Sequence, residues 1–201
     1  MDLLGILYPS LLNADGQVLP SWEDCEQPWS ILDEGEGGLI WQINNCYSED
    51  GIFIHPDAKI GENVLIEGPC YIGSNAEVRH SAYLRKGSWI SENAVVGHAT
   101  EIKNSILLPG SKAPHFNYVG DSIIGFGANL GAGVKLANVR NDKRSIDVRM
   151  EDGSRFHTGM NKLGALIGDG SQLGCNVVTN PGSIITPMSM IGPNMTVLGW
   201  I

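Results

Sequence analysis

The fold of this chain is decided by residues 54–108, which read, in blocks of six, IHPDAK IGENVL IEGPCY IGSNAE VRHSAY LRKGSW ISENAV VGHATE IKNSIL L. Every block opens with an aliphatic residue: Ile54, Ile60, Ile66, Ile72, Val78, Leu84, Ile90, Val96, Ile102 and Leu108. A period of six is a multiple of the two-residue period of a strand and does not fit the 3.6-residue period of an α-helix. The stretch is therefore predicted to be extended chain that bends once in every block.

Small residues recur at fixed places in the block. Asn63, Asn75 and Asn93 occupy the fourth position of their blocks, where Asn tolerates the left-handed backbone of a corner. Three blocks make one coil, and stacked coils bury the aliphatic rows in one continuous core. The pattern predicts an all-β chain, a parallel β-helix with the section of a triangular prism.

The period breaks twice. After Leu108 the next aliphatic row is Ile124, Leu130, Leu136, and this gap exceeds two blocks by four positions, which predicts a short insertion around residues 114–117. The second gap, from Leu136 to Ile167, is longer than five blocks and predicts a hairpin within an excursion over residues 138–162. The excursion carries six of the 13 bases: Arg140, Lys143, Arg144, Arg149, Arg155 and Lys162. The row then resumes as Ile167, Leu173, Thr179, Ile185, Ile191 and Val197.

Residues 1–50 lack the period and form a short α/β extension, either a cap or a linker, ahead of a β-helix domain at 51–201. Pro28 can open a short helix, and residues 38–46 are expected to form a strand. Trp22, Trp29 and Trp41 are expected to cover the open end of the prism, where backbone edges would otherwise be unpaired.

Composition narrows the class of protein. Residues 1–57 hold 11 of the 22 Asp and Glu and no Lys or Arg, which argues against a nucleic-acid partner. No apolar run is long enough for a membrane span, and the start of the chain does not resemble a signal peptide. The four Cys form no CxxC pair and are typical of free thiols in a cytoplasmic protein, with no zinc site expected.

One group of motifs follows the repeat: Leu84-Arg85-Lys86-Gly87, then Glu101-Ile102-Lys103, then residues 111–121 (SKAPHFNYVGD), then Asn129-Leu130-Gly131-Ala132-Gly133, then Asn138. In order and spacing they resemble the acetyltransferase half of the bifunctional enzyme that makes N-acetylglucosamine 1-phosphate and its UDP derivative. The hexapeptide-repeat acyltransferases to which that enzyme belongs have a left-handed β-helix. The excursion and residues 162–168 (KLGALIG) look more like archaeal sugar-phosphate nucleotidyltransferases.

The resemblance implies a homotrimer that moves acetyl from acetyl-CoA to an amino-sugar 1-phosphate, without a metal. It assigns catalysis to His115 and Asn138. It assigns substrate binding to Arg85, Lys103, Tyr118, Asn129 and Lys143, although Arg144 could take the place of Lys143. The backbone of Gly131, Ala132 and Gly133 would meet the acetyl donor.

Residue chemistry agrees with this assignment at two points. A sugar ammonium must lose a proton before it can attack a thioester, and imidazole suits that task at neutral pH, which favours His115 as the base. Arg85 and Lys103 are separated by three blocks, one coil, so two cations would lie side by side and suit a phosphate monoester. His80 and His98 share that spacing and should also stack.

Other interpretations stay open. The chain has no Lys or Arg after Lys162, where the family places a base for the coenzyme A phosphates, and it shows no nucleotidyltransferase half. A regulatory trimer that partners a separate nucleotidyltransferase is therefore an alternative. A γ-class carbonic anhydrase is a weaker one, because its three zinc-binding His have a different spacing. The sequence does not distinguish glucosamine from galactosamine.

Overall fold

The computed structural model describes residues 2–47 and 51–201, and most of it is a parallel β-helix. Three parallel sheets of seven strands each form the sides of a prism, and two further strands pair outside it. Sheet 1 contains β1 (Ile52–Ile54), β4 (Cys70–Ile72), β7 (Ser88–Ile90), β10 (Ser105–Leu107), β13 (Ile123–Ile124), β18 (Ala165–Ile167) and β21 (Ser183–Ile185). Sheet 2 contains β2 (Lys59–Ile60), β5 (Glu77–Val78), β8 (Val95–His98), β11 (Lys112–His115), β14 (Asn129–Leu130), β19 (Gln172–Leu173) and β22 (Met190–Ile191). Sheet 3 contains β3 (Leu65–Ile66), β6 (Tyr83–Leu84), β9 (Glu101–Lys103), β12 (Tyr118–Gly120), β15 (Lys135–Leu136), β20 (Val178–Thr179) and β23 (Thr196–Val197).

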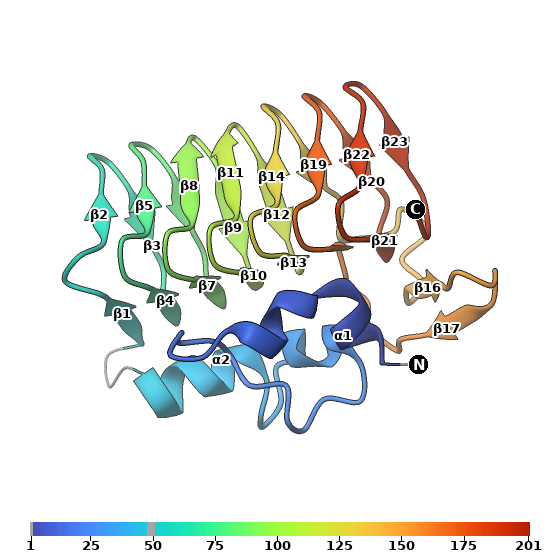
Figure 1. Cartoon of the computed structure of the whole chain (residues 1–201), viewed down its shortest axis with the longest axis horizontal. Helices are drawn as coiled ribbons and strands as arrows, with labels where there is room; N and C mark the ends of the chain where they lie inside the picture. The colour runs from blue at the N-terminus through green and yellow to red at the C-terminus, as the bar shows by residue number, and fades with distance from the viewer. Residues whose placement is uncertain (1, 48–50) are drawn as a thin grey trace.

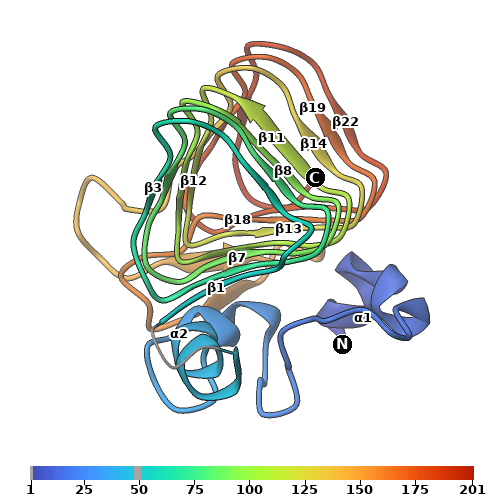
Figure 2. The same cartoon turned by 90° about the vertical axis from the view of Figure 1, so that its left-hand side faces the viewer.

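The coil is left-handed, as the family resemblance implies. In Figure 2 the N-terminal coil faces the viewer, and the chain runs from sheet 1 to sheet 2 to sheet 3 anticlockwise as it recedes. The usual crossover rule for parallel strands predicts the opposite hand, so the resemblance is the better guide here.

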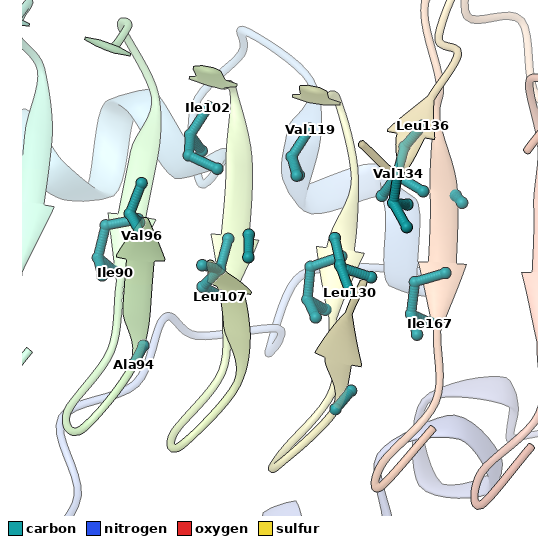
Figure 3. Close-up of a cluster of buried hydrophobic side chains, with 14 of the residues drawn as sticks. Ile90, Ala94, Val96, Ile102, Leu107, Val119, Leu130, Val134, Leu136 and Ile167 are labelled. Atoms are coloured by element: carbon teal, nitrogen blue, oxygen red, sulfur yellow. The ribbon is translucent and has the colours of Figure 1, made fainter. Parts of the chain in front are cut away.

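The aliphatic rows fill the interior of the prism, as the period of the blocks predicts. Ile90, Val96 and Ile102, one from each sheet, are fully buried, and Figure 3 shows such side chains meeting between the sheets. The row after the second gap is also confirmed, because Ile167, Thr179 and their neighbours return to the interior.

The expected insertion near residues 114–117 is wrong. Ile90 pairs with Leu107, and Leu107 pairs with Ile124, so each of these two successive coils is one residue shorter than three full blocks and still stays in register. The omitted residue lies at the corner between sheets 3 and 1, where Asn104 and Asp121 adopt positive φ of 43° and 47°. Leu108 consequently points out of the prism and joins a second core.

That second core lies between sheet 1 and the N-terminal extension. The extension contains α1 (Leu3–Leu7), 3-10 helices at η1 (Pro9–Asn13) and η2 (Pro28–Leu32), α2 (Leu39–Gln42) and a π-helical turn at η3 (Ile43–Tyr47). Figures 1 and 2 show it running along the outer side of sheet 1. Tyr71, Trp89 and Ile106 face outward from sheet 1 and pack with Leu7 and Trp29. Sheet 1 is therefore apolar on both faces, which explains adjacent buried pairs such as Trp89-Ile90.

Two expectations for the extension are wrong, although the helical turn at Pro28 is confirmed. The segment at residues 38–46, expected to be a strand, is helical over residues 39–47, because Leu39 and Ile43 lie one helical turn apart and bury together. The Gln42 amide is buried beside them, where its oxygen accepts from Ser21 N at 2.8 Å. The tryptophans also do not close the prism end, since Trp29 packs on sheet 1 while Ile54 in the first coil is 41% exposed.

Buried polar groups fasten the extension to the prism. The Asp169 carboxylate accepts from Ser10 N at 2.9 Å and from Phe126 N at 2.8 Å, and Asp169 N donates to Leu7 O at 3.0 Å. Asn104 Nδ2 donates to Leu32 O at 2.9 Å. The Asp169 contacts hold α1 and η1 on the prism, and the Asn104 contact holds the end of η2 beside the corner between sheets 3 and 1.

The excursion contains the expected hairpin. β16 (Asp147–Arg149) and β17 (Arg155–His157) are antiparallel and stand off the prism near its C-terminal end (Figure 1). Phe156 meets Trp29 edge to face at 5.3 Å between ring centroids, so hairpin and extension also touch. None of the helices in the described part of the chain has the length and apolar character needed to cross a bilayer.

We predict that Ile90→Asp lowers the free energy of unfolding by several kcal/mol, about 3–5, because it puts an unpaired carboxylate in a dry interior. Leu65→Asp is the control, since Leu65 lies on the outer side of sheet 3 and is 56% exposed. Denaturant titration measures both variants. Equal midpoints for the two would contradict the inward assignment of Ile90.

Candidate functional site

The outer face of sheet 3 gathers most of the residues expected to act on a substrate. Tyr83, Glu101 and Tyr118 lie side by side on neighbouring strands of this sheet. Arg85 and Lys103, each two residues further along its coil, lie side by side in the same way. The predicted juxtaposition of Arg85 and Lys103 is therefore confirmed. His80 and His98 also stack as expected, with ring centroids 4.0 Å apart.

A buried carboxylate organises the corner between sheets 3 and 1. Asp121 is 4% exposed at its side chain and accepts from Lys103 Nζ at 3.1 and 3.0 Å. It also accepts from Asn104 Nδ2 at 3.0 Å and from Asn138 Nδ2. Asp121 thus holds one expected substrate cation and one expected catalytic amide in place together.

Arg85 is held on one side only. Its Nη1 donates to Glu101 Oε1 at 2.9 Å, which raises the pKa of the guanidinium, whereas its buried Nε has no acceptor among the described residues. The guanidinium lies 5.8 Å from the ring centroid of Tyr83. A free, desolvated donor beside a fixed guanidinium is suited to an incoming anion.

Tyr118 links this corner to the middle of the face. Its hydroxyl donates to Asn138 Oδ1 at 3.4 Å. Burial, and then the charges of Glu101 and Asp121, raise the pKa of the Tyr118 hydroxyl. The phenol therefore stays neutral and can act as a hydrogen-bond donor.

His115 lies at the opposite edge of sheet 3, at the end of β11. The side chain is exposed, and the backbone of the residue is fixed on both sides: His115 N donates to Asn117 Oδ1 at 3.0 Å and His115 O accepts from Gly133 N at 3.0 Å. Asn117 Nδ2 in turn donates to Gly131 O at 2.7 Å. The structure therefore brings His115 and the Gly131–Gly133 turn together, one coil apart.

Two expected substrate residues lie outside the Asp121 cluster. Asn129 is on sheet 2, paired with Lys112, on the other side of the corner from Tyr118. Lys143 is exposed in the excursion, with positive φ of 58°, and its N–H donates to Arg140 O at 3.1 Å. Neither contacts the Asp121 cluster within this chain.

A cavity of about 240 Å³ adjoins the Asp121 cluster. Its walls come from three separate parts of the chain: the corner between sheets 3 and 1 (Lys86, Lys103, Asn104, Asp121), the extension (Leu32, Asp33, Glu34, Ile40) and the end of the excursion (Met160, Asn161, Lys162). Asn104 Oδ1 is buried without a hydrogen-bond partner among the described residues. The extension is therefore part of the surroundings of Lys103.

Sequence reasoning missed the neutralising carboxylates. Glu101 and Asp121 both belong to the motifs quoted above, and Asp121 follows Lys103 by three blocks, which places the two side by side. The pairing of Lys103 with Asp121 therefore follows from the spacing, and the pairing of Arg85 with Glu101 follows from their places on neighbouring coils. In the described residues no group of three or more His, Cys, Asp or Glu is arranged to hold a metal ion.

We predict that Asp121→Ala destabilises the protein by about 3–5 kcal/mol, because it leaves the Lys103 ammonium, 12% exposed, without its counter-ion. Glu77→Ala breaks an exposed ion pair with Arg79 and should cost no more than about 1 kcal/mol. Chemical denaturation of both variants tests the difference. Indistinguishable unfolding curves for the two variants would refute the role of Asp121.

Comparison with known proteins adds two kinds of similarity. The family model of the GMPPB C-terminal domain matches residues 66–155. A solved hexapeptide transferase family protein from Anaplasma phagocytophilum is 17% identical with a TM-score of 0.39, over 73% of each chain.

Proteins of similar sequence match a larger share of the chain. A bifunctional sugar-1-phosphate nucleotidylyltransferase/acetyltransferase of Sulfurisphaera tokodaii is 37% identical over 194 residues, which cover 88% of this chain and 46% of the relative. This chain thus spans less than half of that relative. The uncharacterized acetyltransferase YaiX of Escherichia coli is 36% identical over 219 residues, which cover 98% of this chain and 91% of the relative. Together with the left-handed coil of hexapeptide blocks, this near full-length match shows that the chain belongs to the hexapeptide-repeat acetyltransferases.

Proposed function

We propose that this protein transfers acetyl from acetyl-CoA to the amine of an amino-sugar 1-phosphate such as glucosamine 1-phosphate, a step toward UDP-N-acetylglucosamine. The observation that carries the proposal is the layout of sheet 3. A cationic corner with Arg85 and Lys103 lies at one edge, and His115 with the Gly131–Gly133 turn lies at the other. Tyr118 lies between them.

The sugar phosphate would bind at the cationic corner. Arg85 offers its unpaired Nε to the phosphate, while Glu101 fixes the guanidinium from the other side. Lys103 is shared between the phosphate and Asp121. Tyr118 and Asn138 then face the sugar ring, with Asn138 oriented by its bond to Asp121.

The reaction needs one proton acceptor and one oxyanion donor. The amine nitrogen attacks the thioester carbon and its proton passes to the His115 imidazole. The tetrahedral oxyanion then collapses, the C–S bond breaks, and the His115 imidazolium returns the proton to the leaving sulfur, so that coenzyme A leaves as a thiol and the imidazole is neutral again. The Ala132 N–H suits the oxyanion, because it bonds to no acceptor among the described residues and lies in the turn next to His115.

We further propose a homotrimer. Asn129 lies on sheet 2, outside the sheet 3 face of its own chain, so we infer that it meets a substrate on the face of a neighbouring copy. Light scattering at micromolar concentration should give three times the mass of one chain. A stable monomer that still turns over substrate would disprove this arrangement.

A second candidate, a regulatory β-helix that partners a separate nucleotidyltransferase, has one observation in its favour. Both cations of the corner are already paired, Arg85 with Glu101 and Lys103 with Asp121. Thiol release from acetyl-CoA, measured with glucosamine 1-phosphate and galactosamine 1-phosphate, separates the two candidates. Absence of turnover with every amino-sugar phosphate would favour the regulatory role.

We predict that Arg85→Ala raises KM for the sugar phosphate about tenfold or more and changes kcat little, because the phosphate lies away from the reacting amine. Unphosphorylated glucosamine should be a poor substrate for the parent and equally poor for the variant. Steady-state kinetics with both sugars test this. A parent enzyme that uses glucosamine as well as its 1-phosphate would contradict the phosphate site.

We predict that His115→Ala lowers kcat by about 10²–10⁴-fold, the usual contribution of a positioned base. The fold should be retained, because the His115 side chain is exposed and outside both cores. His55→Ala is the matched control, a corner His beside Asp57 in the first coil. A folded His115→Ala variant within about threefold of the parent kcat would exclude His115 as the base.

A further inference from the structure

The hairpin docks on two glycine corners of the C-terminal coils. Gly182 and Gly199 have positive φ of 75° and 78°, and they follow β20 and β23 at the corner between sheets 3 and 1. A Cβ on Gly182 would lie 2.8 Å from Ile146 Cγ2, and a Cβ on Gly199 would lie 3.1 Å from Arg149 Cδ. The absence of these side chains lets the hairpin pack directly on the corner, with the stem of Arg149 over Gly199.

The docked hairpin forms a cavity of about 270 Å³ that is lined by three arginines. Arg140, Arg149 and Arg155 contribute the cations, Asp147 the carboxylate, and Pro181, Gly182, Leu198 and Gly199 the floor. This cavity is separate from the one beside the Asp121 cluster, with which it shares no lining residue.

Two of these arginines occupy directly opposed positions of the hairpin. Arg149 and Arg155 are direct partners in the antiparallel pair of β16 and β17. Neither has an acidic partner within ion-pair distance among the described residues. Like charges in directly opposed positions of a strand pair are destabilising. The electrostatic repulsion between Arg149 and Arg155 therefore destabilises the hairpin, and a bound anion would remove that repulsion.

The carboxylates nearby are engaged elsewhere. Asp142 bonds Arg140 at 2.6 Å and Arg144 at 2.7 Å. Asp147 accepts from His157 Nδ1 at 2.9 Å, and its pKa is lowered first by that bond and then by the charges of Arg155 and Arg140. Asp147 is thus a charged residue of the cavity wall whose hydrogen-bond donor is His157. Arg149 and Arg155 remain available to bind an anion.

A second cavity of about 370 Å³ continues from the first. The two share Arg140, Pro181 and Leu198, and the second extends to Ala137, the residue before Asn138. The two adjoining cavities therefore lead from the arginines to Asn138, at the cationic corner of the candidate site. An elongated ligand could reach from one to the other.

We propose that Arg149 and Arg155, with Arg140 beside them, bind a phosphoryl group of a phosphate ester or diphosphate. Guanidinium groups match phosphate oxygens with paired, charge-assisted hydrogen bonds, and a dianion between two opposed arginines converts their repulsion into attraction. Two sources have this chemistry: the nucleotide end of an acyl donor, and a phosphorylated sugar. Only the choice between these sources depends on the proposed function, because anion binding itself needs no turnover.

Calorimetric titration in phosphate-free buffer tests the site directly. The probes are inorganic pyrophosphate, adenosine 3′,5′-bisphosphate and glucosamine 1-phosphate, and the proteins are the parent, Arg149→Ala, Arg155→Ala and the control Arg79→Ala. Arg79 is a partly exposed arginine at the corner between sheets 2 and 3, paired with Glu77. We expect pyrophosphate binding to weaken about tenfold or more in each hairpin variant and to be unchanged in Arg79→Ala.

The second probe whose binding also weakens in Arg149→Ala and Arg155→Ala identifies the source of the phosphoryl group. Loss of adenosine bisphosphate binding in the hairpin variants, with glucosamine 1-phosphate binding retained, assigns the pocket to the nucleotide end of the donor. The reverse result assigns it to a sugar phosphate. Parent protein that binds no probe, or hairpin variants that bind all probes as the parent does, would overturn the proposal, whether or not acetyl transfer is observed.

Thermal unfolding separates anion binding from a purely structural role. Without ligand, Arg155→Ala should melt at the same temperature as the parent or higher, because the variant relieves the repulsion with Arg149. Pyrophosphate should raise the melting temperature of the parent and of Arg79→Ala, but not that of Arg155→Ala. A ligand-free Arg155→Ala that melts lower, with an unchanged response to pyrophosphate, would show that the arginines serve the fold instead.

Discussion

The structure depends on one constraint: each coil must bring an aliphatic side chain from every sheet to the same level of a narrow interior. Ile90, Val96 and Ile102 satisfy it in one coil, and Leu107, Ala113 and Val119 satisfy it in the next. Because the backbone ladders run between coils, any slip in this register would also unpair three strands. Variation is therefore confined to corners and to segments that leave the prism and return, and those are the places where the candidate sites lie.

Most of the prism could be predicted from the sequence because its period is repeated so often. The error at Leu108 arose because Ile106, Leu107 and Leu108 are all aliphatic, and the period alone does not show which of them points inward. Leu108 is buried as well, but in the second core. Only the pairing of Leu107 with Ile90 shows that two corners each lack a residue and that no insertion follows. The strand expected at residues 38–46 failed for a related reason, since its apolar residues serve a helix that packs on sheet 1.

The sequence predicted which residues belong to the candidate site better than it predicted how they are arranged in space. The separation of one coil correctly placed Arg85 beside Lys103, because coils stack in register and residues one coil apart in the sequence therefore lie on neighbouring strands. The same spacing also places Asp121 beside Lys103, a pairing that sequence reasoning missed, but it does not reveal that the extension forms a wall next to Lys103. Contacts made by segments without the repeat depend on tertiary packing, about which the period carries no information. Asn129 shows the same limit, since its place on sheet 2 follows from which side of a corner it occupies.

The N-terminal extension also bears on how the molecule assembles. A stack of coils that touch only their neighbours can fray or grow from either end, one repeat at a time. Here Leu7 and Ser10 bond to Asp169, across most of the chain, and Leu32 bonds to Asn104. The extension precedes these coils in the chain, so its residues reach their partners only after the coils up to residue 169 have been synthesised. Such long-range closure slows folding, and because the extension contacts several coils at once, the loss of one coil would also release contacts that hold the others.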